Sequence, residues 1–305
     1  MRISPSRVSV DRPADHRRAI LLAGTVRSGT TWASSVINHG NGYRYMFEPL
    51  YPTLPICDQT PARAHLAPDN QEAQIMRQAR AIFEGRVRHA RVDQYNGRAI
   101  SSRRLIKVIH ANLMLPWVRR NFPGMPIVLL LRHPCAVLNS LLRLGWLTVL
   151  HHITAQETLL SGILHPFRSV IAHADSPFEQ HLLLWCVETY VPLHELSPGD
   201  VHVLFYEKLC ESPEAEVSRL FSYLGVPFSP AAVRSVAKPS PQSRVDSPVV
   251  RGSSLTDAWR QEITEKQLDR AMELLHVFGL DRLYSREPMP NVEEARRLMG
   301  LHSAV

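Results

Sequence analysis

The stretch AILLAGTVRSGTTW, residues 19–32, decides the fold. It begins with a short apolar run, Ala19–Leu22, which is typical of a buried parallel strand, and Gly24 follows where the chain has to turn tightly. From Thr30 to His39 the apolar residues have helical spacing, and glycines follow this segment. The sequence therefore predicts a strand, a glycine-bearing loop and a helix in direct succession.

The same alternation of strand and helix continues along the chain without the turn residues of a hairpin. Further strands are expected at Tyr43–Phe47, Leu105–Ile109, Ile127–Leu131 and Val201–Phe205. Helices are expected at Gln71–Val92, Pro134–Leu144, Pro177–Leu196 behind an N-cap at Ser176, Ser212–Gly225, and from a capping box at Thr264 and Gln267 to Phe278. This order predicts an α/β fold, a three-layer sandwich with a central parallel sheet and a P-loop-like first loop.

A single domain is expected from residue 19 to residue 285, because no repeat and no shift in composition divides the chain. Residues 1–18 hold five arginines and are expected to form a flexible basic tail, and residues 286–305 a C-terminal tail. Residues 145–175 are expected to be a mobile insert. The serine- and proline-rich segment Pro239–Ser254 is expected to be a long loop.

The composition is that of an ordinary soluble globular chain of 305 residues, with 45% hydrophobic and 21% charged residues. Its longest apolar runs are far shorter than the ~18 to 20 residues that span a bilayer, so no transmembrane segment is expected. No apolar stretch of a secretory signal follows the basic N-terminus. A cytoplasmic location is therefore expected. The four cysteines lie far apart, which is typical of reduced thiols.

The formal net charge of +7 suits an anionic ligand. The chain has no basic run interleaved with aromatic residues and no nucleic-acid-binding motif, so no nucleic acid is expected among its partners. The adjacent pair His151 and His152 is more typical of a solvated loop than of a chelate, and no metal is expected.

The first loop has the two glycines of a nucleotide-binding P-loop, Gly24 and Gly29, at the usual separation. Thr30 stands where that motif has lysine, and the basic group has moved to Arg27. The predicted strand Ile127–Leu131 is followed by Arg132, where a Mg²⁺-dependent kinase has an acidic ligand. A helix N-terminus can still bind a phosphate here, and the second arginine favours another anion over a metal. A P-loop small-molecule kinase is the alternative that these departures disfavour.

Three blocks of the sequence resemble the sulfotransferases that use 3′-phosphoadenosine 5′-phosphosulfate (PAPS) as sulfuryl donor. Arg27–Trp32 looks like their 5′-phosphosulfate loop, Leu131–Ser140 resembles their 3′-phosphate site, and Phe205–Leu209 is similar to their Tyr-Glu-Asp-Leu strand end. The blocks stand in the family order, and the similarity covers residues 19–50 and 104–285. The resemblance implies a PAPS-dependent O-sulfotransferase with PAPS as co-substrate and no metal.

The resemblance also assigns donor contacts to individual residues. It implies binding of the phosphosulfate by Arg27, Ser28, Gly29, Thr30 and Thr31, of the 3′-phosphate by Arg132, Ser140, Arg251 and Gly252, and of the adenine by Trp32 and Tyr206. The residues themselves leave plainer roles open. The Arg27 loop can be an ordinary capped turn, Trp32 and Tyr206 can pack in the core, Arg132 can form a surface ion pair, and Arg251 can lie in a disordered loop.

Two further blocks, Met46–Tyr51 and Ala258–Arg260, resemble the carbohydrate 6-O-sulfotransferase branch. They imply a hydroxylated acceptor, either a glycan or a small molecule such as a sugar, a glycolipid or a glycosylated metabolite. His133 and Cys135 depart from the family pattern, which has Asp and Arg at these positions. The motifs specify neither the acceptor nor the oligomeric state.

Sulfuryl transfer needs a group that takes the proton of the acceptor hydroxyl. Glu48 follows a predicted strand and is expected at the mouth of the sheet near Arg27, either as this base or in a salt bridge with a neighbouring arginine. Lys107 closes another strand and either points at the sulfuryl oxygens or lies on the surface. His110 is the second candidate base. It comes three residues after Lys107, an offset that turns it to the opposite face of an alternating strand, where a satisfied, half-buried histidine is expected.

Overall fold

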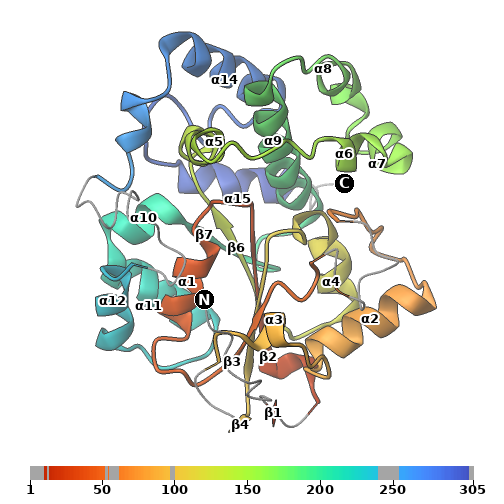
Figure 1. The fold of residues 1–305 in the computed structure, drawn as a ribbon, viewed down its shortest axis with the longest axis vertical. Coiled ribbons are helices and arrows are strands. Elements are labelled where there is room, and N and C mark those ends of the chain that lie inside the picture. The colour runs from red at the N-terminus through yellow and green to blue at the C-terminus, as the bar shows by residue number, and fades with distance from the viewer. Residues whose placement is uncertain are drawn as a thin grey trace.

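The computed structural model describes residues 10–11, 14–51, 54, 62–96, 100–239 and 254–301. A parallel sheet lies at its centre (Figure 1). The sheet has five strands, all parallel, in the order β3-β5-β2-β6-β7. Its strands are β2 (Ala19–Gly24), β3 (Arg44–Phe47), β5 (Arg104–Val108), β6 (Ile127–Leu131) and β7 (His202–Phe205). The predicted α/β fold around a central parallel sheet is confirmed.

Helices connect these strands and surround them. In chain order they are α1 (Thr30–Ile37), α2 (Ala73–Phe83), α3 (Ala90–Asp93), α4 (Leu115–Asn121), α5 (Pro134–Arg143), α6 (His151–Thr154), α7 (Glu157–Ser161), α8 (Arg168–Ala172), α9 (Pro177–Glu195), α10 (Tyr206–Glu211), α11 (Pro213–Tyr223), α12 (Pro230–Val236), α14 (Glu265–Val277) and α15 (Val292–Gly300). The described part also contains 3₁₀ turns η1 (His16–Arg18), η3 (Asn112–Met114), η4 (His165–Phe167) and η5 (Ala258–Gln261), and a small parallel pair of β1 (Val10–Asp11) with β4 (Ile100–Ser101).

Both faces of the sheet are covered, because successive side chains of β2 enter two different apolar cores. Ala19, Leu21 and Ala23 belong to the larger core, which also contains residues of α4, α5 and α9. Ile20 and Leu22 belong to the second core, with residues of α1, α11 and α12. The strand is therefore apolar at every position, and the fold has three layers.

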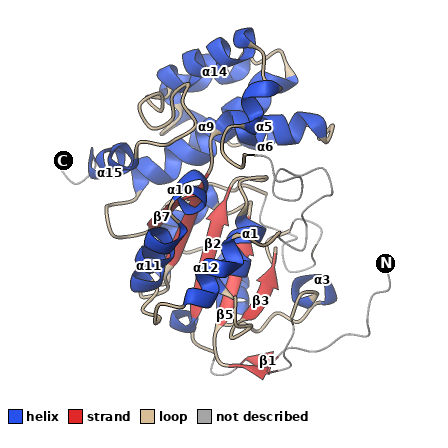
Figure 2. Cartoon of the chain, turned by 90° about the vertical axis from the view of Figure 1, so that its left-hand side faces the viewer, coloured by secondary structure: helices blue, strands red, loops and turns tan. Residues whose placement is uncertain are grey.

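The carboxyl ends of the strands open toward a group of helices. Figure 2 shows α5, α9 and α14 beyond that end of the sheet. Helix α9 begins at the N-cap Ser176, whose hydroxyl accepts the Glu179 N–H at 3.2 Å, and α14 begins at the predicted capping box of Thr264 and Gln267. In open parallel sheets this edge is where ligands bind.

Some stretches differ from the sequence-based expectation. The single helix predicted over Gln71–Val92 is divided into α2 and α3, since the chain turns at Gly85, where φ is 69°. Residues 145–175 contain α6, α7 and α8 and bury Leu159 and Leu164 in the larger core, so they are a packed part of the domain rather than a mobile insert. At both ends, elements occupy parts of the expected tails: β1 pairs with β4, and α15 packs on α9.

Within the described ranges, no helix combines the length and the apolar character that a membrane crossing needs. Three cysteines lie in this part of the chain, Cys135, Cys186 and Cys210, and all are free thiols.

Candidate active site

The loop between β2 and α1 lies at the carboxyl-end edge of the sheet and lines a cavity there. Gly29 caps α1 in the left-handed region, with φ of 99°. A Cβ at this position would lie 2.9 Å from a carbon of the Tyr206 ring, so both the backbone and the available space require glycine. Ser28 tightens the turn, since its hydroxyl donates to the Thr25 carbonyl at 2.6 Å. The start of α1 lines the same cavity, and because the first N–H groups of a helix point away from its own carbonyls, this end suits a phosphate or a sulfuryl group.

Arg27 and Arg132 lie in the same cleft. The Arg27 Nε donates to the Ser140 hydroxyl at 2.9 Å, and a terminal nitrogen of Arg132 donates to the Arg27 carbonyl at 3.2 Å. The Arg132 Nε is buried and makes no hydrogen bond within the described part of the chain. A buried guanidinium nitrogen without a partner is costly, so the geometry suits an anion that supplies the missing acceptor.

Trp32 and Tyr206 form an aromatic wall beside these arginines. Their ring centroids are 5.0 Å apart, and the Arg132 guanidinium carbon lies 4.1 Å from the Tyr206 centroid. The Trp32 Nε1 donates to the Val236 carbonyl at 2.9 Å, which fixes the orientation of the ring. Both aromatic residues are buried and also line the cavity, so each combines core packing with a position that a planar ligand can contact.

Glu48 and Lys107 form a buried ion pair where the neighbouring strands β3 and β5 end. The Lys107 Nζ donates to the Glu48 Oε1, and the Ile109 N–H donates to the Oε2 at 3.1 Å. Glu48 has φ of 49°, an uncommon conformation for a residue other than glycine. Lys107 is only 4% exposed, which rules out the surface alternative, and Glu48 pairs with this lysine rather than with an arginine.

His110 lies in the cavity and not on the opposite face, as strand alternation predicted. Strand β5 ends at Val108, so alternation no longer applies at residue 110. The His110 Nδ1 is buried and has no hydrogen-bond partner among the described residues, which differs from the satisfied histidine that was expected. Burial, together with the positive charges of Arg63 and Lys107, lowers the pKa of His110 to about 3. The ring is therefore neutral at physiological pH.

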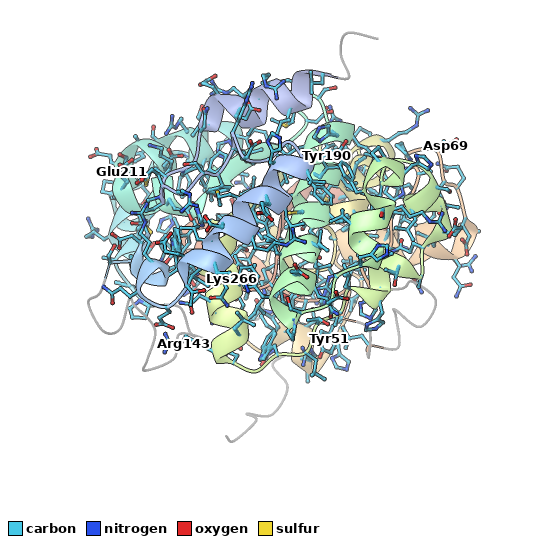
Figure 3. All side chains as sticks on the ribbon, turned by 90° about the horizontal axis from the view of Figure 1, so that it is seen from above. Tyr51, Asp69, Arg143, Tyr190, Glu211 and Lys266 are labelled. Carbon is cyan, nitrogen blue, oxygen red and sulfur yellow. The ribbon has the colours of Figure 1, made fainter. Side chains whose placement is uncertain are left out.

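One cavity of about 880 Å³, near the upper end of the size range of small-molecule sites, is lined by Arg27, Gly29, Thr30, Thr31, Trp32, Glu48, Lys107, His110, Arg132, Ser140 and Tyr206. Ser28, which the sequence also assigned to the phosphosulfate, is fully buried and is not part of the lining. Two of its lining residues, Tyr51 and Arg143, lie along the same edge of the molecule in Figure 3. Among the residues that the structure describes, no cluster of His, Cys, Asp and Glu could hold a metal ion. The predicted 3′-phosphate ligands Arg251 and Gly252 lie outside the described residues.

A phosphate loop, a second arginine at a strand end and a buried acid–lysine pair thus meet in one cleft. A model of the sulfotransferase family matches residues 19–230. The chain belongs to the sulfotransferase family. The match contains every described residue that the sequence assigned to donor binding or catalysis.

Solved structures resemble this sulfotransferase along most of its length at low identity. The sulfotransferase domain from the curacin biosynthetic pathway is 17% identical, with 96% of this chain and 99% of that chain covered and a TM-score of 0.43. The sulfotransferase domain of the Synechococcus PCC 7002 olefin synthase is 16% identical, with 90% and 97% covered and a TM-score of 0.47. A mouse sulfotransferase complexed with 3′-phosphoadenosine 5′-phosphate (PAP) is 15% identical, with 97% of this chain and 91% of that chain covered and a TM-score of 0.42. A search of curated proteins found no match.

A buried carboxylate that sequence reasoning did not assign holds the Arg132 strand end of this sulfotransferase in place. Glu207, in the first turn of α10, accepts the His133 N–H at 2.8 Å and the Tyr284 hydroxyl at 3.0 Å. These groups are 74 and 77 residues away from it in sequence. Glu207 therefore acts on Arg132 through the backbone of the next residue, as a positioning residue.

The two departures from the family pattern serve capping and packing. The His133 Nδ1 accepts the Cys135 N–H at 3.2 Å and so caps α5, while its Nε2 donates to the Ser285 carbonyl at 2.9 Å. The His133 ring stacks on Trp259 with centroids 4.4 Å apart, and burial lowers the pKa of His133 to about 4. Burial also raises the pKa of the Cys135 thiol to about 12. Near neutral pH the His133 ring is therefore uncharged and the Cys135 thiol is protonated, so neither side chain is set up as a proton donor or a nucleophile.

Glu207 should make the sulfotransferase less stable as the pH rises through its titration. Burial raises the pKa of Glu207 from 4.5 to about 6, so the folded state holds this proton more tightly than the unfolded state does. Its contribution is fully present below pH 4.5 and is lost as the pH rises through 6, a change of about 2 kcal/mol. Glu207→Gln removes this titration. The free energy of unfolding in urea is measured for both proteins as a function of pH. The difference between Glu207→Gln and the wild type should rise by about 2 kcal/mol as the pH increases from below 4.5 to above 6. A difference that does not change with pH would contradict the assignment.

Proposed function

We propose that this sulfotransferase moves the sulfuryl group of PAPS to a hydroxyl of an acceptor that is a sugar, a glycolipid or a glycosylated metabolite. The observation that carries the proposal is the convergence of the Arg27 loop, Arg132 and the Glu48–Lys107 pair on one cavity. Transfer of an anionic group to a hydroxyl requires cations for the donor and a base for the acceptor, and the cavity contains both.

In this proposal the donor binds on the side of the cavity formed by the β2–α1 loop and the end of β6. The Arg27 loop and the N-terminus of α1 hold the 5′-phosphosulfate, and Arg132 and Ser140 hold the 3′-phosphate. Both phosphates of the donor are attached to one ribose, so the groups that bind them have to lie close together. The 3.2 Å contact between Arg132 and the Arg27 carbonyl meets this requirement. Trp32 and Tyr206 contact the adenine. Arg251 and Gly252 stay predicted ligands of the 3′-phosphate.

PAPS supplies the sulfuryl group on a phosphate leaving group. The acceptor oxygen forms a bond to sulfur as the bond between sulfur and the bridging phosphate oxygen breaks, and PAP leaves. Glu48 takes the proton of the acceptor hydroxyl. Lys107 stabilises the negative charge that develops on the bridging oxygen. Because the two side chains are already paired, both are held in place before the reaction.

His110 is the alternative acceptor of this proton. Its Nδ1 has no hydrogen-bond partner among the described residues, and the ring lines the cavity. Burial lowers the pKa of this imidazole to about 3, which makes it a weak base at neutral pH.

The assignment of a sugar-containing acceptor rests on the two blocks that resemble the carbohydrate branch. The first, Met46–Tyr51, carries Glu48 to the cavity, and its last residue lines the cavity wall. In the second block, Ala258 and Trp259 line the wall as well. The cytoplasmic location expected from the lack of a secretory-signal pattern stays a prediction.

A product assay tests the proposal. The protein is incubated with PAPS and a panel of hydroxylated acceptors, with and without Mg²⁺, and the products are weighed by mass spectrometry. We expect a gain of about 80 Da on an acceptor, as for one proton replaced by a sulfuryl group, at equal rates with and without Mg²⁺. Transfer of the γ-phosphate of ATP to the same panel, with none from PAPS, would replace the proposal with the kinase alternative.

A further inference from the structure

Arg91 brings a positive charge into the cavity from a segment that the donor motifs do not include. It lies on α3 and lines the cavity, and its guanidinium carbon is 3.8 Å from the centroid of the Tyr51 ring. The Arg91 Nε is buried and makes no hydrogen bond to any described residue. The stacking orients the guanidinium plane but leaves its Nε–H without an acceptor in the described part of the chain.

The fold anchors Arg91 through its neighbours on α3. Asp93 forms a bidentate pair with the fully buried Arg44 of β3, at 2.8 and 2.9 Å. Just beyond α3, the Asn96 side chain donates to the Tyr45 carbonyl at 3.1 Å. This short helix is therefore fixed to the edge strand β3, and the position of Arg91 above Tyr51 is built into the fold.

The other cations of the cavity wall have partners or donor roles. Arg27 and Arg132 are assigned to the donor. Three further cations are in ion pairs: Lys107 with Glu48, Arg63 with Glu188 and Arg143 with Glu262. Asp257 also lines the cavity, but no salt bridge joins it to Arg91. Within the described part of the chain, Arg91 is thus a cavity cation without a carboxylate partner.

Arg91 also lies on the acceptor side of the cavity. It stands over β3, whereas Arg132 follows β6, and β5 and β2 separate these strands in the sheet. Figure 2 shows α3 beside β3, away from β7 and α10. Tyr51, on which Arg91 stacks, comes three residues after Glu48, and its ring centroid is 6.2 Å from that of His110. Arg91 therefore contacts Tyr51, whose ring neighbours His110, and it lies over the strand that leads to Glu48 rather than over the strand that leads to Arg132.

Resting on the proposed function, we infer that the acceptor carries an oxyanion, a carboxylate or a sulfate ester, besides the hydroxyl that is sulfated, and that Arg91 binds this oxyanion. The planar guanidinium offers parallel N–H donors to such a group, and the burial of its Nε makes the pairing stronger than at an open surface. Arg91 is then a specificity-determining residue that selects acidic acceptors.

Paired probes test this inference without turnover. Protein saturated with PAP is titrated calorimetrically at low ionic strength with p-nitrophenyl β-D-glucuronide and with the uncharged p-nitrophenyl β-D-glucoside. A second pair is p-nitrophenyl N-acetyl-β-D-glucosaminide with and without a sulfate ester, so that the two arms separate carboxylate from sulfate. In at least one pair the charged probe should bind at least about tenfold more tightly than its neutral partner, and added salt should weaken this preference.

Arg91→Met should remove the preference while the affinity for the neutral probes and for PAP stays unchanged. Arg77→Met is the matched control, because it deletes an exposed arginine of α2 that does not line the cavity. Two results with the wild type would overturn the inference: equal affinities for the charged and the neutral probe in both pairs, or no binding of either charged probe. Two results with Arg91→Met would also overturn it: a retained preference for the charged probe, or weaker binding of PAP. Failure of the proposed function has a different signature, namely no PAP binding or no sulfuryl transfer by the wild type.

Discussion

Replacing Glu48 with glutamine is expected to lower kcat by about 10²- to 10⁴-fold while the affinity for PAP is retained. Glutamine keeps the shape of the side chain and can still accept the hydrogen bond of Lys107 through its carbonyl oxygen, but it cannot take a proton from the acceptor. The measurement is steady-state turnover with PAPS and the acceptor found in the product assay, together with a PAP titration of the same preparation.

Glu216→Gln is the matched control for this change. Glu216 is also a buried carboxylate in an ion pair, with Arg219 on α11, but it does not line the cavity. Its substitution should leave kcat unchanged. If Glu48→Gln turns over at the wild-type rate, the base is His110 or water, and His110→Ala decides between them, because only the first case predicts that this second variant is inactive.

Replacing Arg132 with methionine is expected to weaken PAP binding by about a hundredfold, equivalent to ~2.7 kcal/mol. Methionine retains an apolar stem against Tyr206 but removes the guanidinium that we assign to the 3′-phosphate. Adenosine 5′-phosphate, which has no 3′-phosphate, should bind the variant and the wild type about equally. Calorimetric titration with both nucleotides measures this contrast.

The surface variant Arg119→Met controls for the loss of one positive charge. Arg119 pairs with Asp200 and its side chain is 41% exposed, so its removal should change neither affinity. An equal loss of affinity for both nucleotides in Arg132→Met would assign Arg132 to the 5′ end of the donor or to the stability of the loop.

Local patterns were sufficient to predict the framework that carries the proposed donor site. Strand β6 has the predicted bounds, and the capping box at Thr264 is present, because apolar runs and caps depend on residues only a few positions apart. Arg27 follows the predicted strand at residues 19–22, and Arg132 follows the predicted strand at residues 127–131. Because parallel strands end at the same edge of a sheet, both arginines were expected at that edge. The structure brings them into one cleft.

The acceptor side could not be predicted, because long-range contacts determine it. His110 enters the cavity since β5 ends before it, and a shift of strand end by one residue is beyond what periodicity resolves. Arg63 meets Glu188 across 125 residues, and the Glu207 contacts are also distant in sequence. Arg91 is locally indistinguishable from the other arginines of an exposed helical segment. One sequence signal was available for Glu207, since an acidic residue directly after a strand end, beside an aromatic residue, stands at the edge where sites form.

A calorimetric titration of the wild-type protein with PAP in the presence of EDTA tests most directly whether these two arginines form a metal-independent site for an adenosine 3′,5′-bisphosphate. We predict binding at least about a hundredfold tighter than that of adenosine 5′-phosphate, with no change when EDTA is replaced by Mg²⁺. PAP binding that is no tighter than that of adenosine 5′-phosphate, or a site that prefers ATP and requires Mg²⁺, would contradict the account.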